Sequence, residues 1–186
     1  MKIKRTSQPD SEPVTLSEAK QHLRVVNSDE DDYIQSLIQT AREDCEKYQN
    51  RSYYTQTWKL VFDELQNDII ELPRPPVQSI DSIVVIDSDG TSNDVTDYDT
   101  DFISEPARLK INNYPNVELA ELNALQITYI AGYSNVSDIP QNVKHAMKLA
   151  IGHWYNERET SVVGTSAQEL PYGVKHLLDK DRVVPV

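Results

Sequence analysis

The stretch from Ile139 to Glu159, IPQNVKHAMKLAIGHWYNERE, constrains the fold most, because its apolar residues recur at helical spacing. Steps of three and four residues place these side chains on one face of a helix, and Pro140 suits a first helical position. The predicted apolar face comprises Val143, Ala146, Met147, Ala150, Ile151 and Trp154, with Lys144, Lys148 and Asn156 on the other side. We therefore expect a helical core built around this segment.

Two features of this helix break ordinary preferences. Gly152 lies in the middle of the outward side, where glycine costs about 1 kcal/mol relative to alanine. It marks either the close approach of another backbone or a tolerated glycine. Glu157 and Glu159 stand at a helix C-terminus, whose dipole favours cations. This indicates either a basic partner nearby or simple solvation of the two carboxylates.

The N-terminal part of the chain also has helical patterns. Thr15-Leu-Ser-Glu18 has the spacing of a capping box and predicts a short helix that ends near Leu23–Arg24. A second helix is predicted with Ser28 as its N-terminal cap and an acidic run in its first turn. Asn50 is expected to end it. Its apolar stripe contains Ile34, Leu37, Ile38, Ala41, Cys45 and Tyr48. Residues 1–13 are polar and contain two prolines, which is typical of a flexible arm.

The middle of the chain has the period of a β-sheet. From Thr55 onward, Trp58, Leu60 and Phe62 alternate with the residues between them, and Ala124–Ala131 (ALQITYIA) is the last strand-like run. The predicted class is α+β, with an antiparallel β domain over residues 55–133 inserted in a helical scaffold of residues 14–54 and 138–160. Residues 161–186 are expected to be a loop, a short helix from Pro171 and a C-terminal docking tail.

Composition limits the classes of function. A net charge of −12 argues against a protein that grips duplex DNA, although an acidic wall would let DNA slide past. Cys45 is the one cysteine, so no internal disulfide can form, and it is expected to be a small core residue. The sequence has no signal-peptide pattern and no apolar run long enough for a membrane span. A soluble cytoplasmic product with no membrane partner is expected.

No motif for catalysis, metal or cofactor binding stands out. Reading the acidic run as an EF-hand loop from Asp87 puts Ser92 at the glycine position and Tyr98 at the glutamate position, so the pattern fails. Starting from Asp97 fails as well. Zinc-site, nucleophile-elbow and phosphate-loop motifs are absent from the sequence, and His153 is read as a boundary residue of its helix. We expect no catalytic residues, no metal and no cofactor.

Six stretches, taken in order, carry a family resemblance. They are PVTLSEAKQHLRV (Pro13–Val25), CEKYQNRSYYTQTW (Cys45–Trp58), IELPRPPVQSIDSI (Ile70–Ile83), YIAGYSN (Tyr129–Asn135), VKHAMKLAIGHWYNERE (Val143–Glu159) and ELPYGVKHLL (Glu169–Leu178). Together they resemble the head–tail connector, or adaptor, proteins of tailed bacteriophages and prophages. The departures are the unusually acidic region 87–124 and the apolar tip Val183–Val186.

The resemblance implies a non-enzymatic structural protein of the virion neck, made in the cytoplasm of the bacterial host. It implies a homo-oligomeric ring of about a dozen copies between the portal protein and the tail or neck completion protein. DNA would pass through the ring without sequence-specific binding.

The residues expected at such contacts fall into two sets. The inter-subunit set is Lys144, Lys148, Gly152, Glu157 and Arg158, and the portal-docking set is Leu177, Leu178, Val183, Val184 and Val186. For the C-terminal tip, a packed or disordered tail is the alternative to docking.

Two rival functions remain open. A soluble module that holds a protein or peptide on its β domain predicts a monomer or dimer. An enzyme with a carboxylate site in Asp87–Asp101 predicts an effect of divalent ions on stability or activity.

Overall fold

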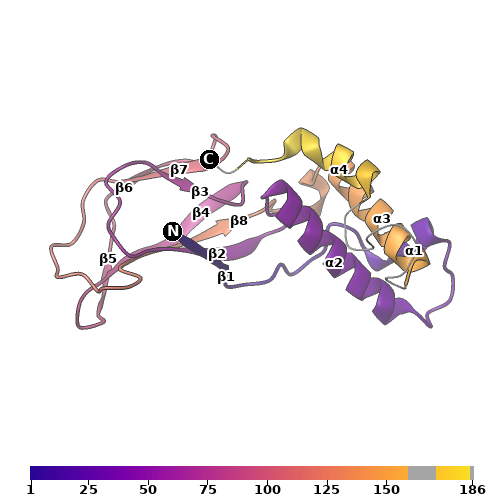
Figure 1. The fold of residues 1–186 in the computed structure, drawn as a ribbon, viewed down its shortest axis with the longest axis horizontal. Helices are drawn as coiled ribbons and strands as arrows, with labels where there is room; N and C mark the ends of the chain where they lie inside the picture. The colour runs from indigo at the N-terminus through magenta and orange to yellow at the C-terminus, as the bar shows by residue number, and fades with distance from the viewer. Residues whose placement is uncertain (159–170, 185–186) are drawn as a thin grey trace. The chain divides into compact units, whose positions relative to one another are not determined.

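The structure is a computed structural model that describes residues 1–158 and 171–184 (Figure 1). Glu159 and Val186, both named above, lie outside the described residues. The chain divides into two compact units. The β unit is Met1–Asp10 with Tyr54–Ser134, and the helical unit is Ser11–Tyr53 with Asn135–Val186. The expected α+β class, with a β region inserted between helical segments, is confirmed.

The helical unit is built around two long helices. These are α2 (Asp31–Gln49) and α3 (Gln141–Asn156), which pack along one another (Figure 1). Both α1 (Leu16–Leu23) and α4 (Tyr172–Leu178) pack against α3, and the short 3-10 turns η1 (Val136–Asp138) and η2 (Asp179–Asp181) flank α3 and α4. The buried side chains include Ile34, Ile38, Ala41, Met147, Ile151, Val174 and Leu178. Shared burial of these apolar faces stabilises helices that would be marginal alone.

Local signals set most helix ends. Thr15 caps α1 and forms the predicted capping box with Glu18. Asn50 ends α2 in the left-handed conformation, with φ of 55°, as its type predicts. The predicted cap at Ser28 is wrong. The Ser28 carbonyl accepts a hydrogen bond from Asp31 N–H in a turn, and Glu30 stands at the cap position.

The β unit contains two antiparallel sheets. The larger has the order β1 (Lys2–Arg5), β2 (Gln56–Phe62), β8 (Leu125–Ala131), β4 (Val77–Ile86), β5 (Ser92–Asp94). The smaller has the order β3 (Ile70–Leu72), β7 (Ala107–Ile111), β6 (Tyr98–Asp101). Leu60, Ile127, Leu109 and Leu72 are all fully buried in one shared core. Two short strands of the acidic region 87–124 lie at sheet edges, β5 in the larger sheet and β6 in the smaller one.

The N-terminus differs from the expected flexible arm over residues 1–13. Lys2–Arg5 forms the edge strand β1, which pairs with β2 and aligns Ile3 with Leu60. The pairing is long-range, and the four residues of β1 are too few for a strand pattern to stand out in the sequence. The backbone hydrogen bonds to β2 therefore order a segment that composition alone places in solvent.

Candidate functional site

Arg42 is the centre of a charged cluster inside the helical unit. Its Nε donates to Glu12 at 2.8 Å and its Nη1 donates to Glu46 at 3.0 Å, while Glu43 lies 3.6 Å from Nη2. Arg42 is 1% exposed and Glu46 is nearly as buried. Burial raises the pKa of Glu12, and the Arg42 charge and hydrogen bond oppose that rise. The cluster fastens the segment before α1 to the middle of α2.

The end of α2 holds the C-terminal segment in place. The Gln49 side chain donates to the carbonyl of Leu178 at 2.6 Å, and the Gln49 carbonyl accepts from Val183 N–H at 2.9 Å. The Asn50 amide donates to the Val183 carbonyl at 2.8 Å. Leu178 is itself fully buried. Leu178 and Val183 are therefore fixed within the helical unit, which differs from their expected role as free docking residues.

Two members of the portal-docking set remain at the surface. Leu177 is half-buried, and its carbonyl accepts a hydrogen bond from Asn142 at 3.1 Å. Val184 is 71% exposed and directly follows the fixed Val183. Val184 therefore leaves the helical unit directly after a residue that α2 holds in place.

The inter-subunit residues predicted on α3 turn partly inward. Lys144 is only 8% exposed, so it does not lie on the expected outward face. A Cβ on Gly152 would lie 3.3 Å from His22 Nε2, so the close neighbour of this glycine is a side chain of α1. Burial, followed by the charge of the half-buried Lys148, lowers the pKa of His22. Helix α1 packs against α3, so the side of α3 that carries Gly152 is covered within the chain.

Arg158 is engaged with the start of α2. Its Nη2 lies 2.5 Å from the Glu30 carboxylate, and its guanidinium stands over the rings of Tyr33 and Tyr155 at 4.8 and 5.0 Å. Tyr155 also donates to Glu30, and these hydrogen bonds lower the pKa of the Glu30 carboxyl. This arrangement holds the last turn of α3 against α2.

Glu157 also has a basic neighbour within the chain. His153 Nε2 lies 3.6 Å from its carboxylate, an ion pair only when the imidazole is protonated. For Glu157, the nearest potentially basic group is thus one turn away on α3 itself.

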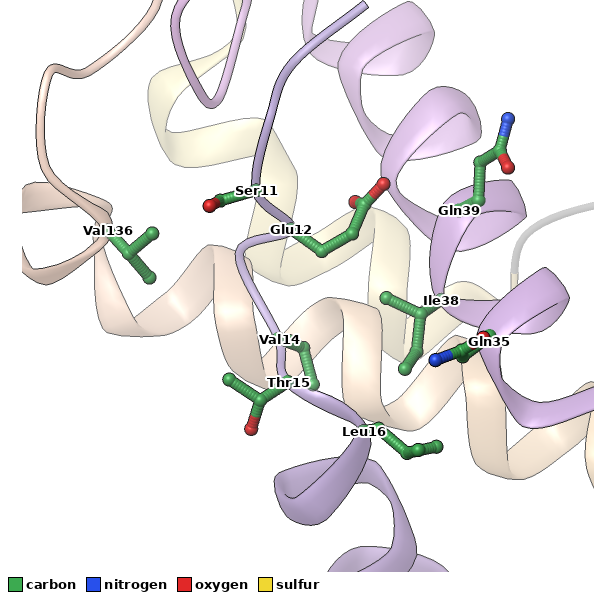
Figure 2. Close-up of a pocket in the computed structure, with 9 residues that line it drawn as sticks. All are labelled: Ser11, Glu12, Val14, Thr15, Leu16, Gln35, Ile38, Gln39 and Val136. Atoms are coloured by element: carbon green, nitrogen blue, oxygen red, sulfur yellow. The ribbon is translucent and has the colours of Figure 1, made fainter. Parts of the chain in front are cut away.

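A groove opens beside α1 and α2, with a volume of about 490 Å³ (Figure 2). Val14, Leu16, Ile38 and Val136 supply its apolar side chains, and Ser11, Glu12, Thr15, Gln35 and Gln39 supply polar ones. Three separate segments meet here, so no local sequence pattern marks the groove. The Thr15 hydroxyl donates to Glu18 at 2.8 Å as part of the capping box of α1, so this polar group of the lining serves the helix end.

The acidic region shapes turns. The Asp87 carboxylate accepts from the N–H groups of Asp89 and Thr91, and the Asp101 carboxylate is held by Arg108 at 2.5 Å. Arg108 is the main cause of the lowered pKa of Asp101.

Within residues 1–158 and 171–184, no three histidine, cysteine or acidic side chains gather as metal ligands. In the same ranges, none of the helices has the length and apolar character needed to cross a membrane. Cys45 is fully buried, as predicted.

A family model described as head completion protein matches residues 12–178. The chain belongs to the head completion protein family. The resemblance to phage connectors is therefore confirmed, and the chain is a structural virion protein with a head–tail connector role and not an enzyme. No curated protein matches the sequence.

Solved structures share the fold of this head completion protein. One is a chain from the neck of an empty gene transfer agent particle computed with C6 symmetry, at 19% identity and a TM-score of 0.83. Others come from the virion of the native particle, at 18% and 0.82, and from its neck computed with C12 symmetry, at 19% and 0.79. Each match covers 100% of this chain and 97% of the other chain. Strand β1 precedes the residues that the family model matches.

Proposed function

We propose that this head completion protein forms a ring of about a dozen copies in the virion neck, between the portal protein and the tail. The observation that carries the proposal is the full-length fold match to a chain from a neck computed with C12 symmetry, with a TM-score of 0.79. A cyclic ring needs two different surfaces on each copy that fit one another after rotation. The DNA channel would pass through the centre of that ring.

The charge of the chain suits a channel wall. With a net charge of −12, the ring would repel DNA phosphates instead of releasing their counterions. DNA would then move through the neck without sequence-specific binding and without strong adhesion.

The contacts proposed for the ring follow the residues that stay accessible. Leu177 and Val184 are proposed to dock on the portal, and Lys148 to contact a neighbouring copy. Val186, which lies outside the described residues, is proposed for portal docking from the sequence alone. Because Val183 is fastened to Gln49 and Asn50, Val184 leaves the helical unit from a fixed position. The tail or neck completion protein would bind elsewhere on the ring.

The ring is tested by measuring the mass of the purified chain over a range of concentrations, with electron micrographs of the largest species. We expect closed rings, and particles that lack the protein should be filled heads without tails. A chain that stays monomeric or dimeric at high concentration would contradict the proposed ring, and normal virions in its absence would contradict the proposed role in the neck.

Portal docking is tested with a matched pair of substitutions. Val184→Asp should weaken binding of the purified ring to the portal protein, because it places a charge in an apolar contact. Val26→Asp is the control, since Val26 is 99% exposed in the loop between α1 and α2. Equal binding by both variants would argue against docking through the C-terminal tip.

A further inference from the structure

The larger sheet of the β unit has two exposed edges, β1 and β5 (Figure 1). Its five strands are all antiparallel to their neighbours, so the two edge strands run in the same direction. An edge strand directs part of its backbone N–H and C=O groups away from the sheet and can accept another strand. The two edges differ sharply in charge.

The β1 edge is basic in a chain that is otherwise strongly acidic. Lys2 and Lys4 are exposed, and Lys4 stands directly opposite Lys59 in the register of β1 with β2. Like charges directly opposite one another on a sheet are destabilising. Lys59 donates to Gln126, a neutral partner, and Lys2 has only a 3.7 Å contact with the exposed Asp63. This face of β1 therefore has positive charge to spare.

The opposite edge carries the complementary charge at the same level of the sheet. The register runs from Lys2 through Val61, Gln126 and Val84 to Asp94, so Lys2 and Asp94 end one cross-strand row. Residues in one such row point to the same face of the sheet. Asp94 is exposed and has no ion pair within the described residues.

The residues around Asp94 add to the negative charge of the β5 edge. The segment from Asp87 to Asp101 contains six aspartates and no lysine or arginine. Asp89, at the turn before β5, is also exposed and lacks an ion pair in residues 1–158 and 171–184. The β5 edge is therefore as strongly acidic as the β1 edge is basic.

We propose that the β1 edge of one copy contacts the β5 edge of the next copy, with Lys2 facing Asp94 and with Lys4 and Asp89 flanking that pair on opposite sides. This inference rests on the proposed ring and names the contact that joins its copies. Lysines on an edge ordinarily discourage pairing with any strand. A second copy of this chain can still pair here, because the negative charge of its β5 edge neutralises the lysines of β1.

The geometry agrees with a cyclic assembly. The two surfaces are different and lie on opposite edges of one sheet, which is what a head-to-tail contact requires. Because β1 and β5 run in the same direction, a ring axis roughly along the strands brings them together in parallel. Each copy then offers one basic and one acidic edge, and no edge of this sheet stays unpartnered in a closed ring.

The test uses charge reversal in the full chain, with ring formation measured by mass at increasing protein concentration. Lys2→Glu/Lys4→Glu should raise the concentration needed for rings by roughly tenfold or more, since every contact becomes acidic against acidic. Adding Asp89→Lys/Asp94→Lys to the same chain should restore rings, because both edges are then reversed together. Lys47→Glu/Lys180→Glu is the control with the same change in net charge on exposed positions of the helical unit.

The outcomes separate this contact from the ring itself. Rings that form normally with Lys2→Glu/Lys4→Glu would overturn the edge contact and leave the proposed function standing. A Lys2→Glu/Lys4→Glu variant that forms normal rings and only binds DNA more weakly would likewise overturn the edge contact and leave the proposed function standing. Loss of rings without rescue by the double reversal would also overturn it. A wild-type chain that forms no ring would end both proposals.

Discussion

The buried charge at Arg42 gives the sharpest prediction about stability. Arg42→Met keeps an apolar stem of similar length but leaves the carboxylates of Glu12 and Glu46 without the guanidinium that they contact. Removing one partner of a buried ion pair costs about 3–5 kcal/mol. Glu46 is 5% exposed but Glu12 is 31% exposed and keeps part of its hydration, so we expect the lower end, about 3 kcal/mol.

The loss should depend on pH in a defined direction. The pKa of Glu12 is raised above its ordinary value of 4.5, mainly by burial, and Arg42 opposes the rise. Without Arg42 this pKa rises further. A carboxyl with a raised pKa in the folded state destabilises the protein above that pKa, and the destabilisation disappears as pH falls through it. The deficit of Arg42→Met should therefore be largest near pH 7 and smaller near pH 5.

Thermal unfolding followed by circular dichroism measures both effects. For a chain of 186 residues, 1 kcal/mol corresponds to about 2–4 °C, so the midpoint should fall by roughly 6–12 °C at pH 7. Lys47→Met removes an exposed charge from the same helix and should shift the midpoint by no more than about 2 °C. A shift for Arg42→Met as small as that of the control, or a deficit that grows toward pH 5, would refute the reasoning.

Two other predictions concern single positions. Burial raises the pKa of the Cys45 thiol to about 12, so iodoacetamide at about pH 8 should modify it only in unfolded protein, and rapid labelling of the native chain would contradict this. Gly132→Ala should destabilise the β unit by at least about 3 kcal/mol in denaturant titrations, because φ is +110° and a Cβ would lie 2.1 Å from the Tyr54 carbonyl oxygen. Gly90→Ala is the matched control: φ is +83° with nothing within 4 Å of the new atom, so only the backbone strain remains, about 1–2 kcal/mol, and equal losses would count against the clash.

Features that depend on a few neighbouring residues could be predicted from the sequence. The capping box at Thr15 and the stop at Asn50 follow from side-chain hydrogen bonding and from tolerance of positive φ. The burial of Cys45 follows from helical spacing. The α+β class follows from the change of period along the chain, which reflects the faces that each element buries.

Features that depend on distant partners could not be predicted in this way. Lys144 lies on the polar side of α3 by spacing alone, yet it is 8% exposed in a helix that packs against α1, α2 and α4. The groove beside α1 needs Val14, Ile38 and Val136 from three separate segments. Strand β1 exists because β2 pairs with it. In each case the deciding contact lies outside any local window of sequence.

These corrections also change where contacts between copies are best sought. The sequence pattern favours helix α3 for these contacts, but Gly152 faces His22, and Arg158 is held by Glu30 and two tyrosine rings. A side chain that is already paired must give up those contacts before it can bind a neighbour, which reduces the net gain. This cost is smaller at the sheet edges. Lys4 stands opposite a like charge, Lys59, and Asp94 has no ion pair in the described part of the chain, while Lys2 would exchange only its 3.7 Å ion pair with the exposed Asp63. The free energy of association should therefore be gained mainly at the sheet edges. The helices should serve mainly to hold the C-terminal segment up to Val183 in place, so that Val184 leaves the helical unit from a fixed position.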